Sequence, residues 1–249
     1  MSGLTMTFLG SGDAFGSGCK LQTCMCVDTG DNKFLIDCGA TAMIGIRRFN
    51  VEPNDISTIF ISHMHGDHYA GIPFFILDAQ LVSKRIEPLT IFVPAGCKSQ
   101  LITGIEALFP GSYGSPKKFD VKIMEMSAGE KCYQGDIEAI SYKVNHSGLD
   151  ARALRITTKG VTIAYSGDTD WQDSLLDCAR DADVFVAEAY YYDKKVKFHL
   201  DFASLKENVD KIKAKKYILT HMSTDMLNVP KEELVGFELA EDGKVFNIG

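Results

Sequence analysis

Four side chains that can bind metal ions lie within six residues of one another, directly after an apolar stretch: His63, His65, Asp67 and His68. His63 and His65 are two residues apart, so one face of an extended chain can present both to the same ion. Gly66 permits a sharp turn, after which Asp67 and His68 can face a second ion. Imidazole and carboxylate ligands suit zinc, iron or manganese, so the segment predicts a metal site.

Three further candidate ligands follow predicted strands later in the chain: His146, Asp168 and His221. Taken alone, His146 has the ordinary explanation of a structural histidine, and Asp168 that of a turn residue or the cap of a helix near Gln172. A catalytic metal site between two sheets requires ligands gathered on one rim, and strand ends supply such a rim. Because a purely structural site closes its coordination with four ligands, seven candidates favour a catalytic centre.

The elements that must position these residues alternate between short strands and helices. Strands are predicted at 4–9, 25–27, 33–36, 57–61, 89–93, 119–126, 137–144, 151–157, 161–165, 184–187, 217–219 and 245–248. Helices are predicted at 40–49, 72–81, 99–108, 172–179, 203–213 and 231–234. No repeat or long linker interrupts this order. We therefore expect a single domain over residues 1–249 of the α/β (α+β) class, a four-layer αββα sandwich with helices outside two packed sheets.

The bulk properties exclude several protein classes. The proportions of apolar and charged residues exclude a disordered or fibrous chain. A formal net charge of −7 does nothing to attract nucleic acid or an anionic membrane. Residues 1–9 lack the basic start and the long apolar core of a signal peptide, and we expect a cytoplasmic protein. The seven cysteines are an odd number and do not suggest a disulfide framework.

Two other motifs allow competing interpretations. Gly10, Gly12 and Gly16 follow a strand as in a dinucleotide-binding loop, but the third glycine comes one place late and no helix is predicted there. A tight turn explains these glycines better. Cys24 and Cys26 share one face of a strand and could bind a structural zinc, although no second pair stands at zinc spacing.

The order and spacing of the candidate ligands resemble those of the metallo-β-lactamase superfamily, from Thr7 to Met222. The resemblance implies two divalent metal ions, zinc in the first place, with manganese or iron as alternatives. One ion is then held by His63, His65 and His146. The other is held by Asp67, His68 and His221, and Asp168 bridges the two.

Within that superfamily the chain is most similar to tRNase Z and its small phosphodiesterase relatives. The resemblance rests on the 34–39 segment Phe-Leu-Ile-Asp-Cys-Gly, the 71–73 segment Gly-Ile-Pro, and Ala-Glu-Ala at 187–189 followed by His199. It implies that Glu188 and His199 assist proton transfer as catalytic residues, and that Asp67 also orients the nucleophile. The serine or threonine that usually follows the histidine is replaced by Leu200 and Asp201, so a surface histidine on a loop stays an open alternative.

The segments that could contact a substrate are short. Family tRNase Z enzymes carry a long basic arm, whereas 110–118 is only a short loop. The tyrosines at 190–192 and the lysines at 194, 195 and 197 could stack a base and hold a phosphate, or could form a solvated loop with packed rings. Trp171 is a candidate pocket wall or an ordinary core residue.

Together these features predict a dinuclear hydrolase that cleaves a small or cyclic phosphodiester through a hydroxide bridging the metals. The alternatives are tRNA 3′-end processing in the manner of tRNase Z, lactone or sulfate-ester hydrolysis, and a non-catalytic, metal-stabilised binding module. The expected partner is a small-molecule phosphodiester, with RNA less favoured and no membrane. The resemblance also implies a homodimer.

Overall fold

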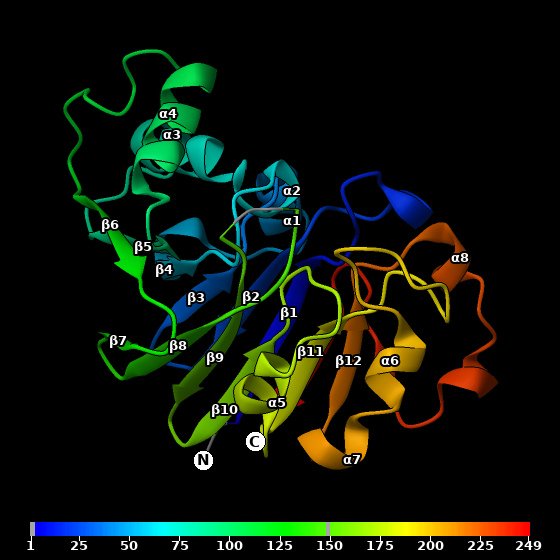
Figure 1. Cartoon of the computed structure of the whole chain (residues 1–249). Helices are drawn as coiled ribbons and strands as arrows, with labels where there is room; N and C mark the ends of the chain where they lie inside the picture. Colours follow the sequence, from blue (N-terminus) through cyan, green and yellow to red (C-terminus); the bar gives the residue numbers. More distant parts are fainter. Residues whose placement is uncertain (1–2, 148–149) are drawn as a thin grey trace.

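The computed structural model describes residues 3–147 and 150–249, and within them the chain forms two sheets of seven strands (Figure 1). The first sheet has the order β14-β1-β2-β3-β4-β5-β6. Its strands are β1 (Leu4–Gly10), β2 (Cys24–Asp28), β3 (Lys33–Ile36), β4 (Ile56–Phe60), β5 (Leu89–Pro94), β6 (Val121–Met126) and β14 (Val245–Ile248). β14 pairs antiparallel with β1, so the two ends of the described chain are neighbours.

The second sheet has the order β13-β12-β11-β10-β9-β8-β7 and repeats the design of the first. Its strands are β7 (Lys131–Gln134), β8 (Ile137–Lys143), β9 (Arg152–Thr158), β10 (Val161–Tyr165), β11 (Val184–Glu188), β12 (Tyr217–Thr220) and β13 (Glu238–Leu239). In each sheet three antiparallel pairings are followed by three parallel ones. The parallel strands therefore end together at one edge of each sheet.

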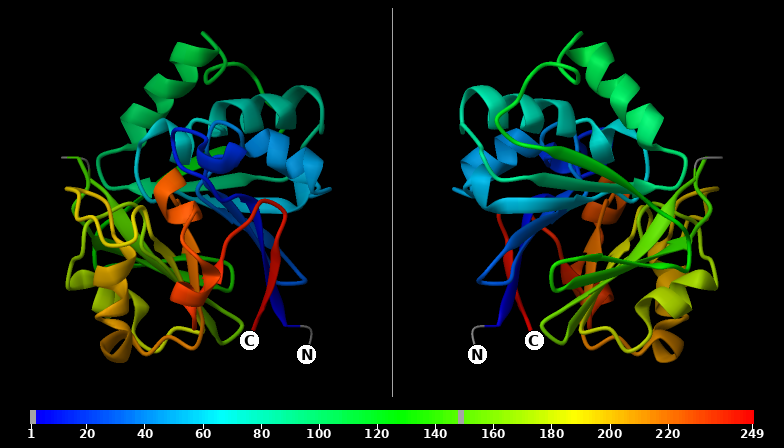
Figure 2. Two further views of the ribbon diagram at one scale, coloured as in Figure 1. Left: turned by 90° about the vertical axis from the view of Figure 1, so that its right-hand side faces the viewer. Right: turned by 90° about the vertical axis from the view of Figure 1, so that its left-hand side faces the viewer.

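Helices cover the outer face of both sheets, which gives the four layers visible in Figure 2. The first sheet carries α1 (Ala42–Arg48), α3 (Ile72–Leu81) and α4 (Lys98–Leu108). The second carries α5 (Ser174–Ala179), α6 (Phe202–Lys206), α7 (Val209–Ile212) and α8 (Thr224–Leu227). The short helix α2 (Gly66–Tyr69) and the 3-10 turns η1 (Ser17–Cys19), η2 (Pro53–Asp55) and η3 (Lys231–Leu234) complete the elements. The predicted αββα sandwich is confirmed.

Alternation along the central strands explains the packing of these layers. In β4, Phe60 points between the sheets and stacks on Phe92 with ring centroids 4.9 Å apart, while Ile59 points toward the helices. In β11, Val186 lies between the sheets and Phe185 lies under the helices. Strands with both faces buried are mostly apolar, which is why β11 is an unbroken apolar run from Val184 to Ala187. Full burial of each such side chain contributes about 1.5–3 kcal/mol to folding.

The structure differs from the predicted elements in several places. The two-residue strand β13 and the four-residue helices α2 and α8 were not predicted. The strand β7 was not predicted, because its residues Lys131–Gln134 are partly exposed and form a polar edge. The helix predicted over 203–213 is divided into α6 and α7, and Asn208 at the break donates a side-chain hydrogen bond to the carbonyl of Ser204. In the residues that the structure describes, no helix is long and apolar enough to cross a membrane.

Candidate metal centre

The candidate ligands gather where strands of both sheets end. His63 follows β4, His146 follows β8, Asp168 follows β10 and His221 follows β12. The backbone of His221 is left-handed, with a φ of 54°, a conformation that is uncommon for non-glycine residues but more frequent for histidine than for most. The strand ends thus deliver side chains that are far apart in the sequence to one rim between the sheets.

The first group of side chains is His63, His65 and His146, whose ring nitrogens lie within 4.8 Å of one another. Nε2 of His146 is 2.9 Å from Nδ1 of His65. The other ring nitrogen of His146, Nδ1, lies 2.8 Å from the carbonyl oxygen of Phe198 and donates to it. This bond fixes the ring so that its Nε2 faces the group, the usual arrangement for a metal-binding histidine.

The second group is Asp67, His68, Asp168 and His221, all of them buried. Oδ2 of Asp168 is 3.3 Å from Nε2 of both His68 and His221. The same oxygen is 4.0 Å from Nε2 of His146 in the first group. Asp168 therefore stands between the two groups, in the position that a bridging carboxylate requires.

The donor set fits divalent metal ions. Ligand atoms that surround an ion tetrahedrally at about 2.1 Å are separated by about 3.4 Å, close to the spacing of the second group. Nε2 of His63 and Oδ1 of Asp168 are buried without a hydrogen-bond partner in the described part of the chain. An unpartnered buried polar atom is costly, and a bound cation removes that cost.

Charge in the second group is balanced between carboxylates and imidazoles. Burial opposes a charged His68, yet Asp168, Asp37 and Asp67 together raise its pKa well above the usual value. Burial likewise opposes a charged Asp168, yet His221 and His68 hold its pKa well below the usual value. A proton and a metal ion would therefore compete for Nε2 of these histidines.

Asp37 is a further residue of the candidate site, and the sequence alone indicated no role for it. Its Oδ2 is 2.7 Å from Nδ1 of His68, which leaves Nε2 of His68 facing the second group. The carboxylate also accepts hydrogen bonds from the backbone nitrogen and the hydroxyl of Ser62, each at 2.8 Å. Asp37 lies in the 34–39 segment on which the family resemblance rests. The sequence does not show that it lies beside His68; the fold does.

Two glycines let the ligand loop pack closely on the chain after β3. A Cβ on Gly39 would lie 2.3 Å from the carbonyl oxygen of Asp67, and one on Gly71 would lie 2.3 Å from that of Gly39. The backbone nitrogen of Cys38 donates to the carbonyl of His68 at 2.6 Å. The loop that carries Asp67 and His68 is therefore held by main-chain contacts. The turn expected at Gly66 is the start of α2.

His199 and Glu188 lie beside the second group. Nδ1 of His199 is 2.5 Å from Oε1 of the fully buried Glu188. Burial lowers the pKa of His199, but the hydrogen bond and the charge of Glu188 outweigh it, so that the pKa is raised. The ring of Tyr190 stacks on His199 with centroids 4.7 Å apart. Leu200 packs in the core and Asp201 caps α6. The two residues that replace the family's serine or threonine therefore have structural roles.

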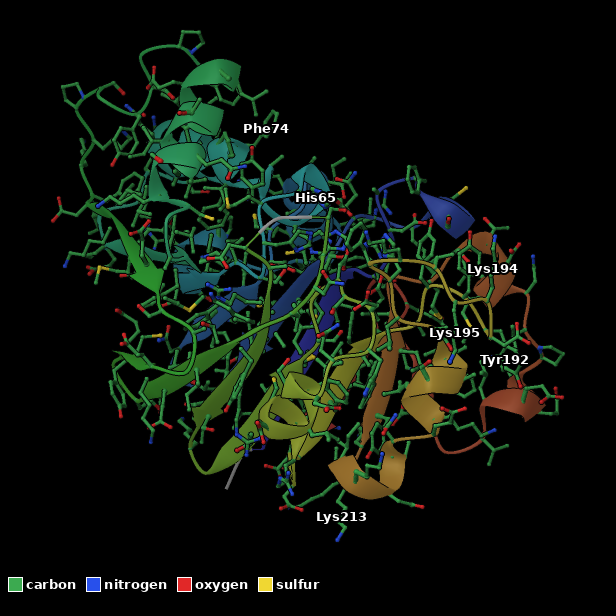
Figure 3. All side chains as sticks on the ribbon, viewed as in Figure 1. His65, Phe74, Tyr192, Lys194, Lys195 and Lys213 are labelled. Carbon is green, nitrogen blue, oxygen red and sulfur yellow. The ribbon has the colours of Figure 1, made fainter. Side chains whose placement is uncertain are left out.

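A cavity of about 310 Å³ opens over these groups. It is lined by Ala14, Phe15, His65, Gly66, Asp67, His146, Ser147, Asp168, Tyr190, His199 and His221. Tyr192 instead packs on Phe202 and donates to Glu233. Figure 3 places Tyr192, Lys194 and Lys195 on an edge of the molecule away from His65. Of the predicted base-stacking tyrosines, only Tyr190 lines the cavity.

Other motifs have structural explanations. Trp171 packs against the core under the second sheet and does not line the cavity. Cys24 and Cys26 are buried beneath the helices of the first sheet. Among the described residues, the groups able to hold a metal contain no cysteine. The glycine loop after β1 leads into the three-residue turn η1, as the interpretation as a tight turn requires.

Comparison with known proteins independently supports the assignment of the fold. Residues 4–246 match the family described as Anti-Pycsar protein Apyc1. A ribonuclease Z from Pyrococcus horikoshii is 24% identical, over 88% of this chain and 86% of its own length. The crystal structure of the metallo-β-lactamase fold protein YhfI from Bacillus subtilis superposes with a TM-score of 0.82 at 20% identity, over 99% of this chain and 100% of its own. A diphosphatase from the PhnP family superposes with a TM-score of 0.77 at 20% identity, over 98% and 97%. The chain has the metallo-β-lactamase fold.

Proposed function

This chain belongs to the Anti-Pycsar protein Apyc1 family, and from that premise we propose that it is a metal-dependent hydrolase that cleaves a small or cyclic phosphodiester. The observation that carries the proposal is the cavity of about 310 Å³, which is lined by members of both ligand groups and by His199. Pockets for small molecules span roughly 300–1,000 Å³, and this cavity is at the small end of that range. It suits a mononucleotide better than a folded RNA.

Two divalent ions, zinc in the first place, would be held by the two groups of side chains. His63, His65 and His146 would hold one ion, Asp67, His68 and His221 would hold the other, and Asp168 would contact both. When bound, such ions lower the pKa of a water molecule and neutralise charge on phosphoryl oxygens. Manganese or iron would suit the same ligands.

The chain's own residues would handle the protons. Asp67 lines the cavity, where its carboxylate would orient the attacking water. His199 also lines the cavity, and its bond to Glu188 through Nδ1 leaves Nε2 for the substrate. A proton held at Nε2 would pass to the leaving oxygen as the phosphodiester bond breaks. Glu188 would keep the imidazole oriented and charged until that transfer.

A second candidate function is RNA processing, because several similar proteins carry the name ribonuclease Z. Two features favour the small substrate. The net charge of −7 opposes binding to many phosphates of an RNA backbone. The alignment with the Pyrococcus enzyme runs over 271 positions although 88% of this chain is only about 219 residues, so that enzyme has segments that this chain lacks.

A direct test is a hydrolysis panel with the metal-reconstituted protein. The panel contains cyclic nucleotides, bis-p-nitrophenyl phosphate, a lactone, a sulfate ester and precursor tRNA. We expect turnover of the phosphodiesters and intact tRNA. Cleavage of precursor tRNA at its 3′ end faster than any small phosphodiester would overturn the proposal, as would turnover confined to the lactone or the sulfate ester.

A further inference from the structure

Phe198 has an unusual backbone conformation for a bulky residue. Its φ is 74°, the largest positive φ among the described residues other than glycine. An aromatic residue is a rare occupant of this left-handed region, because its Cβ crowds the backbone there. Residues held in such conformations cluster at functional sites, where the contacts around them offset the strain. Phe198 directly precedes His199, so the contacts that hold Phe198 also bear on the place of the proposed proton donor.

Hydrogen bonds hold the backbone of Phe198 on both sides. Its carbonyl oxygen accepts from Nδ1 of His146 at 2.8 Å, the bond that orients this metal ligand. Its backbone nitrogen donates to Oδ2 of Asp170 at 3.4 Å. A bridge between Val196 and His199 closes the turn around it. The strained turn thus connects a ligand of the first group to the loop that carries His199.

The carboxylate of Asp170 is the other end of this connection. Its Oδ2 also accepts from Nδ2 of Asn145 at 2.7 Å, and its Oδ1 accepts from Nε2 of Gln172 at 2.5 Å. Asn145 directly precedes His146. Hydrogen bonds to a carboxylate are stronger than those between neutral groups. One carboxylate therefore holds both the residue before a metal ligand and the residue before the proposed proton donor.

Asp170 makes these contacts from outside the cavity. It does not line the cavity, whereas His146 and His199 both do. The rings of these two histidines lie with centroids 5.1 Å apart, although they belong to different loops. A proton donor acts only within hydrogen-bond reach of its acceptor, and a displacement of about 1 Å can cost roughly 100-fold in rate. The loops that carry the two histidines must therefore be fixed relative to each other.

We propose that Asp170 is a positioning residue that fixes His146 and His199 relative to each other through the turn at Phe198. This role deepens the proposed function and rests on it, since His199 donates its proton in that reaction. Without the carboxylate, the nitrogen of Phe198 loses its partner and the residue relaxes toward an ordinary conformation. Its carbonyl then no longer meets His146, and His199 moves with the same turn. A change outside the cavity thus weakens both metal binding at the first group and proton donation.

The test compares Asp170→Ala with Asp170→Asn. In Asp170→Ala we expect kcat to fall by roughly 100-fold on a phosphodiester with a poor leaving group, the effect of a displaced catalytic group. The loss should be smaller with bis-p-nitrophenyl phosphate, whose leaving group needs little protonation. KM should change little, because Asp170 does not line the cavity. Zinc affinity, measured by competition with a chelator, should fall by roughly 10- to 100-fold, as when a histidine ligand loses the partner that orients it.

Asp170→Asn is the conservative variant. Its amide oxygen can replace Oδ2 as acceptor for Asn145 and Phe198, and its amide nitrogen can donate to Gln172 once that amide has turned. It should therefore restore most of the kcat and the zinc affinity that alanine removes. The matched control is Asp173→Ala, which removes a nearby exposed carboxylate and should change neither. A loss in Asp170→Asn as large as that in Asp170→Ala would overturn the positioning role.

The histidines provide a measurement that needs neither substrate nor metal. All six histidines of the chain belong to the groups at the candidate site, so their ring signals in nitrogen NMR report on it. In the metal-free protein, Asp170→Ala should shift the signals of His146 and His199. The signal of His68, which Asp37 orients, should stay in place, whereas a general loss of structure would move all six. Unchanged signals of His146 and His199 would overturn the proposal.

Asn145→Ala tests the same connection if Asp170→Ala does not fold. It removes the 2.7 Å bond at an exposed residue, where a folding defect is not expected. The signal of His146 should shift and zinc affinity should fall. If both stay at their wild-type values in this variant, the connection through Asp170 is excluded.

The NMR and zinc measurements also separate this role from the proposed function. If the wild-type protein hydrolyses no phosphodiester, the proposed function fails, yet Asp170→Ala should still shift the two histidine signals and weaken zinc binding. If hydrolysis is observed and the signals and zinc affinity are the same in both proteins, only the positioning role fails.

Discussion

Nδ1 of His199 donates a hydrogen bond of 2.5 Å to Oε1 of Glu188, a carboxylate with no solvent exposure. The other oxygen of Glu188 accepts from the backbone nitrogens of Thr169 and Leu200, at 2.9 and 3.1 Å. Thr169 follows Asp168, and Leu200 follows His199. One buried carboxylate therefore ties the loop of the proposed proton donor to the loop of the proposed bridging ligand.

Replacing His199 with alanine should leave the metal content unchanged and lower kcat. The expected loss is roughly 10²–10⁴-fold, the usual effect of removing a general acid. The loss should be smaller for substrates whose leaving group is already acidic, such as nitrophenol, because these need little help from a proton donor. Steady-state kinetics with good and poor leaving groups measures the difference. Equal losses on both would exclude His199 as the donor.

Replacing Glu188 with glutamine should change the pH dependence of kcat. Burial lowers the pKa of His199, and the bond and charge of Glu188 raise it above the usual value. The acid form is therefore present below this raised pKa and is lost as the pH rises through it. Without the carboxylate the pKa falls, so the alkaline limb of the kcat profile should move to lower pH.

The control for this profile is Glu207→Gln, which removes an exposed carboxylate of the neighbouring helix region. It should leave the alkaline limb in place. A limb at the same pH in Glu188→Gln and in the wild-type protein would contradict a role of Glu188 in charging His199.

Replacing Asp168 with alanine should lower metal occupancy in both groups, because its carboxylate lies 3.3 Å from nitrogens of the second group and 4.0 Å from the first. Elemental analysis after dialysis measures the number of ions per chain. Asp173→Ala is the control, since Asp173 is exposed and lies outside the groups that could hold a metal. Full occupancy in Asp168→Ala would rule out the bridge.

Replacing Asp37 with asparagine should weaken metal binding at the second group without removing a ligand. Asp37 has a φ of 56°, and asparagine adopts this left-handed conformation more readily than most residues, so the backbone should be preserved. The loss of a partner that orients a metal-binding histidine typically costs about 10- to 100-fold in affinity. Competition with a chelator measures this loss. Asp28→Asn, at a more exposed strand end, should bind metal like the wild-type protein.

The ligand groups and most of the strands could be predicted because each rests on local information. Alternation and apolar runs determine strands such as β3 and β10, whose predicted bounds match the structure. Histidine spacing in the 63–68 segment indicates which side chains an extended chain can present together. Ligands at strand ends follow the same reasoning, since parallel strands that end at one edge bring them to one rim.

The remaining features depend on contacts between distant segments. Asp37 acts on His68 across 31 positions of the chain, and no spacing rule indicates the pair. The turn that exposes Phe15 is shaped by Asp13, whose hydrogen bonds are visible only once the loop is folded. The lysines at 194 and 195 are close to His199 in sequence, but the loop turns them outward. Their proximity to His199 in the sequence therefore does not place these lysines at the cavity.

The pairing of β14 with β1 affects the order in which the protein can fold during synthesis. The first strand, Leu4–Gly10, leaves the ribosome early, but one of its edges has no neighbour until residues 245–248 have been made. The candidate ligands are also spread from His63 to His221. Neither the first sheet nor the full set of ligands is complete in a nascent chain. We therefore expect truncated translation products to expose a free strand edge and to bind metal incompletely, which makes them targets for chaperones and proteases.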